Sequence, residues 1–303
     1  MIKIPSYLKP GDVIGITCPA GYMEREKVLQ CVATLQNWGY CVVMGSTVGG
    51  NSQTYFSGKD EERLADLQAM LDDDGINAVL CGRGGYGVGR IIDQIDFKKF
   101  RKKPKWVIGF SDITVFHAHV NRKLGIATLH APMAAAFNDN GYRNKYVKSL
   151  KAALQGVKAD YTCKGHRLNQ PGEATAMLVG GNLALMVHTI GTPSEIETNG
   201  RILFIEDVGE QKYNIDRMMY QLKRSGKLAK LRGLILGGFT DVLDTTRPFG
   251  EEVHDILRHL VEEYDYPICY NFPVSHDKEN YALKVGCTYH LFVSAKQVRL
   301  RED

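Results

Sequence analysis

The sequence predicts an α/β protein whose first domain is built on a parallel sheet. Short, continuously apolar runs alternate with segments of helical spacing through the first half of the 303-residue chain. Strands that are apolar on both faces are typical of parallel sheets covered by helices on both sides. The pattern changes beyond residue 157, which predicts a second α/β domain with additional β structure.

The elements of the first half follow from runs and turns. Val13–Thr17 is a β-branched run after a Lys-Pro-Gly-Asp turn, and Leu64, Leu67 and Leu71 share one helical face. Gly39 ends the expected helix at 24–38. Strands are expected at 13–17, 40–44, 78–81 and 106–109, and helices at 24–38 and 61–71.

A polar segment with a proline and two glycines separates the two halves. Residues 158–172 are therefore expected to be a linker between an N-terminal domain, 1–157, and a C-terminal domain, 173–303. In the second half, helices are expected at 183–190, 215–225 and 253–264, and strands at 201–205, 233–238, 268–272 and 289–293.

Composition argues against nucleic acid and membrane partners. Apolar residues make up 44% and charged residues 24% of the chain, and the net charge is only +4. The densest basic run, Lys98–Lys103, is expected to be a solvated turn. The start lacks the apolar region of a signal peptide, and no stretch approaches the ~18 apolar residues of a membrane span.

The seven cysteines indicate a reducing compartment. They are scattered singly with no Cys-x-x-Cys pair, so neither a zinc cluster nor a disulfide framework is predicted. Cys18, Cys41 and Cys81 lie in or beside strand-like runs, where a buried packing role is expected. We expect a cytoplasmic protein.

A glycine-rich segment, Gly82–Arg90, follows the third expected strand. Its glycines would let backbone N–H groups approach an anion or a reacting carbonyl. It lacks the Gly-Lys-Ser/Thr of a triphosphate-binding loop. Gly82, Gly84 and Gly87 match the dinucleotide spacing, but after the third strand and with no ribose-binding acid at the end of the next. A nucleotide site and a purely structural turn stay open as alternatives.

Ser111 stands between an apolar strand and an expected helix. The carboxyl end of such a strand is where α/β sheets carry catalytic groups, and the helix behind it favours a developing oxyanion. The surrounding Gly-Phe-Ser-Asp-Ile lacks the second glycine of a nucleophile elbow, since Ile113 takes that place. Ser111 could instead be a helix N-cap, a role that Asp112 could also fill.

Three acids gather at the end of a later strand. Glu206, Asp207 and Glu210 could bind a metal, orient a histidine or simply be solvated. Glu206 directly follows the apolar run and is best placed for a buried contact.

One of nine histidines lies in a loop just after a strand. This is His276, whereas His254 and His259 fall on an expected helix and His188 on an apolar one, where core packing is expected. His130, before Ala-Pro, is the main rival as a functional histidine.

Ser111, Glu206 and His276 together supply a nucleophile, an orienting carboxylate and a general base. Histidine, with a pKa near ~6.5, can take the serine proton when a carboxylate fixes its tautomer. The two expected domains would then share one site, in a cleft between them.

Five motifs in chain order resemble the LD-carboxypeptidase family along nearly the whole sequence. They are Gly82–Gly87, Gly109–Thr114, Gly180–Leu183, Phe204–Glu210 and Phe272–His276. The resemblance implies a flavodoxin-like parallel-sheet N-terminal domain and a smaller, β-rich α/β C-terminal domain. It also implies a cytoplasmic serine peptidase of cell-wall recycling, usually a homodimer, with a Ser-His-Glu triad and neither metal nor cofactor.

Carried over by residue, the resemblance makes Ser111 the nucleophile, His276 the base and Glu206 its orienter. Asp112 and Gly85 would donate backbone N–H groups to the oxyanion hole. A carboxypeptidase must also recognise a free C-terminus, and a guanidinium does so with two hydrogen bonds, so Arg83 is expected to bind the substrate carboxylate.

The expected reaction is hydrolysis of the amide between the L-centre of diaminopimelate, or lysine, and the terminal D-alanine of a murein tetrapeptide. One alternative is an enzyme similar to the microcin C immunity peptidase, which cleaves aminoacyl or peptidyl nucleotide analogues. Another is a catalytically silent peptide-binding protein. A segment Ser275–Asp277 departs from the family, which carries a glycine beside the histidine.

Overall fold

The protein divides into two compact units in a computed structural model that describes residues 2–303. The first unit comprises the described residues up to Val157 together with Tyr281–Gly286, and the second comprises Lys158–Asn280 and Cys287–Asp303. The segment 158–172, expected as a linker, belongs to the second unit and contains strand β6, Asp160–Lys164. Residues 281–286, expected in the C-terminal domain, group instead with the first unit.

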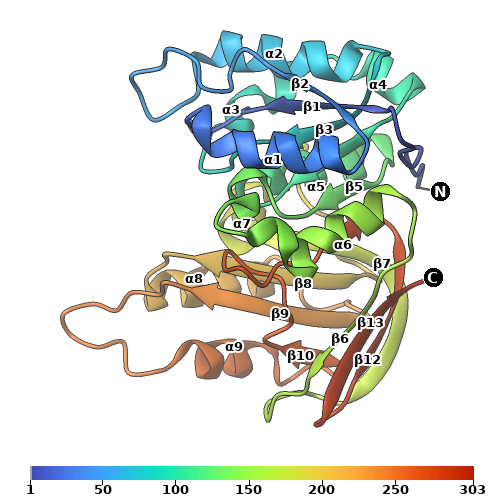
Figure 1. The fold of residues 1–303 in the computed structure, drawn as a ribbon. Helices are drawn as coiled ribbons and strands as arrows, with labels where there is room; N and C mark the ends of the chain where they lie inside the picture. Colours follow the sequence, from blue (N-terminus) through green and yellow to red (C-terminus); the bar gives the residue numbers. More distant parts are fainter. Residues whose placement is uncertain (1) are drawn as a thin grey trace. The chain divides into compact units, whose positions relative to one another are not determined.

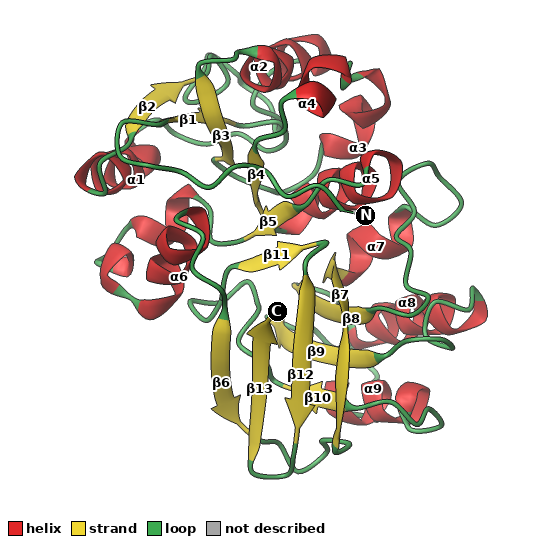
Figure 2. Ribbon diagram, turned by 90° about the vertical axis from the view of Figure 1, so that its right-hand side faces the viewer, coloured by secondary structure: helices red, strands yellow, loops and turns green. Residues whose placement is uncertain are grey.

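A six-stranded sheet of order β11-β5-β4-β3-β1-β2 forms the centre of the first unit. Figure 1 labels β1, β2, β3 and β5 of this sheet, and Figure 2 labels all six strands. Its first five strands in sequence are parallel and follow the order 2-1-3-4-5 of flavodoxin-like sheets. β11 pairs antiparallel with β5. The strands are β1 Val13–Thr17, β2 Cys41–Met44, β3 Ile76–Cys81, β4 Trp106–Gly109, β5 Thr128–His130 and β11 Leu283–Val285.

Helices cover both faces of this sheet, as the apolar strands predict. Helix α1 lies on one face, and α2, α4 and α5 lie on the other (Figure 2). The four central strands are almost wholly buried. The helices are α1 Glu26–Asn37, α2 Asp60–Asp72, α3 Val88–Ile91, α4 Lys98–Lys102, α5 Thr114–Leu124 and α6 Lys145–Leu154.

The second unit contains a seven-stranded mixed sheet of order β10-β9-β8-β7-β12-β13-β6. The pairs among β7, β8, β9 and β10 are parallel, and the pairs from β7 through β12 and β13 to β6 are antiparallel. Besides β6, its strands are β7 Gly172–Asn182, β8 Ile202–Val208, β9 Gly233–Thr240, β10 Ile268–Tyr270, β12 Thr288–Val293 and β13 Gln297–Glu302.

Three helices cover one face of the parallel half of this sheet. They are α7 Leu183–His188, α8 Lys212–Arg224 and α9 Val253–Val261, in sequence between the parallel strands (Figure 2). The fold class is confirmed: one flavodoxin-like sheet and one β-rich mixed sheet, each with helices. No helix within residues 2–303 is long and apolar enough to cross a bilayer.

Three local expectations were wrong. Cys41 is exposed, because β2 is the edge strand and only one of its faces is covered. The basic run beginning at Lys98 forms the short helix α4, which buries Phe100 while the lysines face solvent. His188 is exposed at the end of α7 and does not pack in the core.

Candidate active site

Ser111 occupies a sharp turn at the carboxyl end of β4. It begins a short 3-10 helix, Ser111–Ile113, that runs directly into α5. Its φ is +62°, in the left-handed region that non-glycine residues seldom adopt. A strained, half-buried serine between strand and helix is the arrangement of a nucleophile elbow, although the second elbow glycine is missing.

Close packing around Gly109 shows why the turn needs a glycine there. A Cβ at this position would lie 2.8 Å from Cγ1 of Ile113, the residue that replaces the second elbow glycine. The carbonyl of Gly109 accepts a hydrogen bond from Nε2 of His117 at 2.9 Å. His117 is fully buried, and burial lowers its pKa to about 4, so it is a neutral donor that fixes this end of the strand.

The glycine-rich loop after β3 lies against Ser111. A Cβ on Gly84 would be 2.8 Å from Cβ of Ser111 and 3.1 Å from its Oγ. The Gly84 carbonyl accepts a hydrogen bond from the N–H of Gly21, in the loop after β1. Gly85 has a φ of +100° and faces Tyr55. Gly84 therefore contacts the serine, and the predicted oxyanion donor, Gly85, is its neighbour in the chain.

Ser111 is not the N-cap of either helix that follows it. The N-cap of the 3-10 helix is Phe110 and that of α5 is Ile113, and neither position has a side-chain cap. The carboxylate of Asp112 caps a different helix, α3, by accepting the N–H of Val88 at 2.8 Å. Sequence reasoning missed this contact because it joins the starts of two short helices 24 residues apart.

In the second unit, Glu206 and His276 form a close pair. Nδ1 of His276 lies 2.6 Å from Oε2 of Glu206. The glutamate is fully buried in β8, whereas the histidine is 16% exposed. Oε1 of Glu206 has no hydrogen-bond partner among the residues the structure describes. This geometry orients the imidazole with Nδ1–H toward the carboxylate, so that Nε2 is the basic nitrogen.

Two glycines of β9 make room for the histidine loop. A Cβ on Gly237 would lie 2.2 Å from the carbonyl oxygen of Val274, and one on Gly238 would lie 2.5 Å from Cβ of Ser275. The N–H of Gly238 donates to the Val274 carbonyl at 2.9 Å. A Gly-Gly pair ending an apolar run was the sequence signal for this close approach.

Ser275, directly before the histidine, stabilises the loop. Its hydroxyl donates to the Glu279 carbonyl at 3.1 Å and accepts the N–H of Asp277 at 3.0 Å. The histidine therefore projects from a short hydrogen-bonded turn.

The other two acids of the β8 cluster have separate structural partners. Asp207 accepts hydrogen bonds from Asn182 and from the N–H of Ala184, at the start of α7. Burial raises its pKa to about 6. Glu210 accepts from Asn214 on α8. No group of three or more histidine, cysteine or acidic side chains suited to a metal ion occurs within residues 2–303.

Two further candidates lie in the first unit. Arg83 is exposed and donates one hydrogen bond, from Nη1 to the carbonyl of Tyr22 at 2.7 Å. His130 is fully buried on β5, opposite Gly109, with its ring against Phe110. The structure thus brings Ser111, Asp112 and the glycine loop together in one unit, and Glu206 with His276 in the other.

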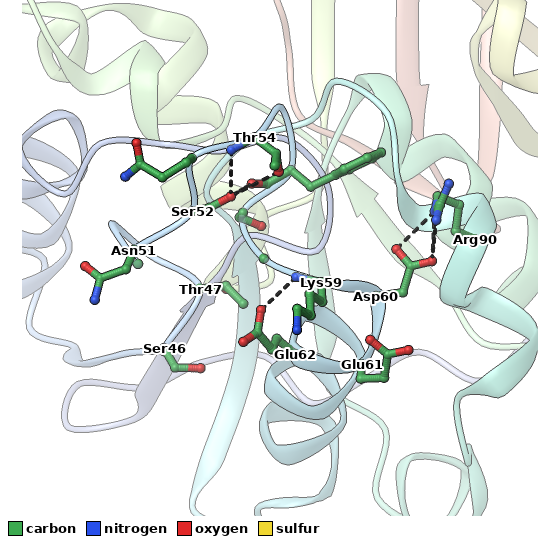
Figure 3. Close-up of a pocket in the computed structure, with 15 residues that line it drawn as sticks. Ser46, Thr47, Asn51, Ser52, Thr54, Lys59, Asp60, Glu61, Glu62 and Arg90 are labelled. Atoms are coloured by element: carbon green, nitrogen blue, oxygen red, sulfur yellow. Dashed lines mark hydrogen bonds and ion pairs between the residues drawn. The ribbon is translucent and has the colours of Figure 1, made fainter.

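A cavity of about 730 Å³ in the first unit is lined by Arg90 and by residues 46, 47, 50–54 and 56–62 (Figure 3). Its polar groups bind one another: Arg90 pairs with Asp60, and the N–H of Lys59 donates to Glu62. None of the predicted site residues lines it. This cavity is separate from the candidate catalytic groups.

Family comparisons match both halves of the chain. The family model of the LD-carboxypeptidase N-terminal domain matches residues 14–131, and that of the LD-carboxypeptidase C-terminal domain matches residues 175–291. A probable murein peptide carboxypeptidase of Bacillus subtilis is 37% identical over 93% of this chain and 89% of the relative. The murein tetrapeptide carboxypeptidase of Pseudomonas aeruginosa is 32% identical over 91% of each chain.

Solved structures agree with this relationship. The muramoyltetrapeptide carboxypeptidase from Oxalobacter formigenes is 27% identical, with a TM-score of 0.87 over 96% of this chain and 98% of that structure. The microcin C7 self-immunity protein MccF, solved with aspartyl sulfamoyl adenosine, has the same TM-score over 99% of this chain and 98% of that structure. At 21% identity, the second likeness concerns the fold alone.

Proposed function

Because the chain belongs to the LD-carboxypeptidase family, we propose that it removes the terminal D-alanine from murein tetrapeptides during cell-wall recycling. The scissile amide joins D-alanine to the L-centre of diaminopimelate or lysine. The relatives named as murein peptide carboxypeptidases support the substrate class. The 2.6 Å contact between Glu206 and His276 carries the assignment of a serine mechanism, because it orients a base.

The proposed triad is Ser111, His276 and Glu206. Nε2 of His276 takes the Ser111 hydroxyl proton as Oγ attacks the carbonyl, and Glu206 stabilises the imidazolium that forms. The imidazolium then gives that proton to the departing D-alanine nitrogen, leaving an acyl-enzyme. A water molecule, deprotonated by His276, attacks the ester and returns the free serine.

The proposed oxyanion hole consists of the N–H groups of Asp112 and Gly85. Asp112 lies in the first turn of the 3-10 helix, where N–H groups have no partner within the helix. Across a trans peptide, the N–H points opposite to the carbonyl. Since the Gly84 carbonyl is directed at Gly21, the N–H of Gly85 points away from that loop. Two such donors stabilise the tetrahedral oxyanion.

Recognition of the substrate C-terminus is proposed for Arg83. Among residues 2–303, its guanidinium donates one hydrogen bond, to the Tyr22 carbonyl. A guanidinium has five donors, so a bidentate contact with a carboxylate is still available. The same residue would then distinguish a free carboxylate from an amide.

We propose that the enzyme acts in the cytoplasm as a homodimer. The seven cysteines are all free in the structure, which suits a reducing compartment. Light scattering of the purified enzyme at micromolar concentration tests the dimer, since a mass near one chain would contradict it.

The test of the function is D-alanine release from UDP-MurNAc-tetrapeptide, measured beside cleavage of an acyl-sulfamoyl adenylate. The proposal predicts rapid release of D-alanine and a much lower kcat/KM on the adenylate. Preference for the adenylate would indicate an activity like that expected of an immunity peptidase. Binding of the tetrapeptide without turnover would indicate a peptide-binding protein.

A further inference from the structure

A buried carboxylate joins the nucleophile turn to the glycine-rich loop. Asp112, which follows Ser111 directly, is fully buried and accepts the N–H of Val88 at 2.8 Å. Val88 is the first residue of α3, immediately after the loop Gly82–Gly87. One residue therefore carries a proposed oxyanion donor on its backbone and holds the loop with the other donor through its side chain.

The same end of the loop is held from the opposite side by Arg63 of α2. Arg63 is fully buried, and its Nη1 donates to the Gly87 carbonyl at 3.1 Å and to the Pro19 carbonyl. Gly87 has a φ of +150°, and a Cβ there would lie 2.7 Å from Nη1 of Arg63. The Gly87–Val88 segment is thus bound at a carbonyl by a cation and at an N–H by an anion.

Burial of this carboxylate carries an electrostatic cost. Burial raises the pKa of Asp112 to about 6, while the Val88 N–H and the charge of Arg63 act in the other direction. The Cys81 thiol of β3 also interacts electrostatically with this carboxylate. Oδ1 of Asp112 has no hydrogen-bond partner among the residues the structure describes. Unpaired buried oxygens are rare and costly in folded proteins.

We infer that the Asp112 carboxylate is a positioning residue that fixes the Gly82–Gly87 loop relative to Ser111 and so sets the spacing of the oxyanion donors. This inference rests on the proposed serine mechanism. The Asp112 carboxylate acts through Val88 and not on the substrate. Its removal should therefore slow the acylation step and leave substrate affinity nearly unchanged. A misplacement of about 1 Å in an active site can cost on the order of 10²-fold in rate.

The test compares Asp112→Ala, Asp112→Asn and Val88→Pro in the full-length enzyme, with kcat and KM measured by D-alanine release. Asp112→Ala is expected to lower kcat by about 10- to 100-fold, with KM changed by less than about 3-fold. Asp112→Asn keeps an oxygen that can accept the Val88 N–H, so it should recover most of the rate. Val88→Pro removes that N–H at the first helical position, where proline is tolerated, and should lower kcat as Asp112→Ala does.

Lys105→Met is the matched control for a lost buried charge. Lys105 precedes the same strand, β4, at its opposite end, where Nζ donates to the carbonyls of Met70 and Asp73. This variant should lose stability but keep the kcat of the folded enzyme. Unchanged kcat in Asp112→Ala, or in Val88→Pro if Asp112→Ala does not fold, overturns the inference. Full activity in Ser111→Ala would instead overturn the proposed function, so the two failures are distinguishable.

Discussion

Nδ1 of His276 lies 2.6 Å from Oε2 of Glu206, and the glutamate is fully buried in β8. The two residues are 70 positions apart and meet because β9 carries two glycines where the histidine loop approaches. The neighbouring acids, Asp207 and Glu210, bind other partners. Of the three acids in the cluster, Glu206 is thus the one directed at a histidine.

Replacement of this carboxylate tests the orienting role. Glu206→Gln keeps the shape but removes the charge that favours the imidazolium, so kcat for D-alanine release is expected to fall by about 10²- to 10⁴-fold. Glu210→Gln is the control, because the Glu210 side chain accepts from Asn214 on α8 and the substitution should leave kcat within about 2-fold. Equal effects of the two substitutions would argue against Glu206.

The contact between Gly84 and Ser111 predicts a steric sensitivity. Gly84→Ala places a methyl group 2.8 Å from Cβ of Ser111, so the serine or the loop must shift. We expect kcat to fall by about 10²-fold, because a displaced nucleophile no longer meets the carbonyl correctly. Gly75→Ala, in the turn before β3, approaches the Asp73 carboxylate, with the new methyl group 3.2 Å from Oδ1, and serves as the control. Wild-type kcat in Gly84→Ala would show that the position of this loop does not affect the reaction.

Recognition of the free C-terminus by Arg83 predicts lost discrimination. The wild-type enzyme should cleave a tetrapeptide much faster than the same peptide with a C-terminal amide. Arg83→Ala should raise KM for the free acid by about 10-fold or more, since a bidentate contact is lost. The free acid and the amide should then be cleaved at similar rates. Retained discrimination in Arg83→Ala would assign the carboxylate to another residue.

Burial of His117 predicts a dependence of stability on pH. Its pKa is lowered from 6.5 to about 4, so the unfolded chain binds a proton between these values and the folded chain does not. The free energy of unfolding is therefore highest, as far as His117 is concerned, above pH 6.5. It falls by about 3 kcal/mol in total as the pH is lowered toward 4.

Denaturant unfolding of the wild type and His117→Gln from pH 7.5 to 4.5 measures this term. Glutamine can still donate to the Gly109 carbonyl but does not titrate in this range. The difference between the two proteins should change with pH below 6.5 and be flat above it. The buried Asp112 and Asp207, whose pKa values are raised to about 6, act in the opposite direction and are common to both proteins. A difference that is constant with pH would show that His117 does not titrate abnormally.

Continuous apolar runs made the central strands predictable. β1, β3 and β4 lie at or within two residues of their expected positions because their burial on both faces leaves a clear signal. The sequence predicts a loop at the end of the long strand β7, because Gly180 and Gly181 interrupt its apolar pattern. The return of β11 to the first sheet depends on pairing with β5 across more than 150 residues, which local patterns do not encode.

Some features of the candidate site could likewise be predicted from the sequence, and others could not. Ser111, Glu206 and His276 could be proposed because each polar residue follows an apolar strand. The left-handed backbone of Ser111 could not be predicted, since its φ depends on packing between Gly109 and Ile113. The link from Asp112 to Val88 was equally hidden, because a carboxylate after a serine suggests a local cap.

D-alanine release by Ser111→Ala, beside the wild type on UDP-MurNAc-tetrapeptide, tests the central claim most directly. Circular dichroism and the unfolding midpoint serve to verify that the variant is folded. The account predicts a fall in kcat of about 10³-fold or more, because no other group replaces the attacking oxygen. Turnover within about 10-fold of the wild type by the folded variant would contradict a serine mechanism at this turn.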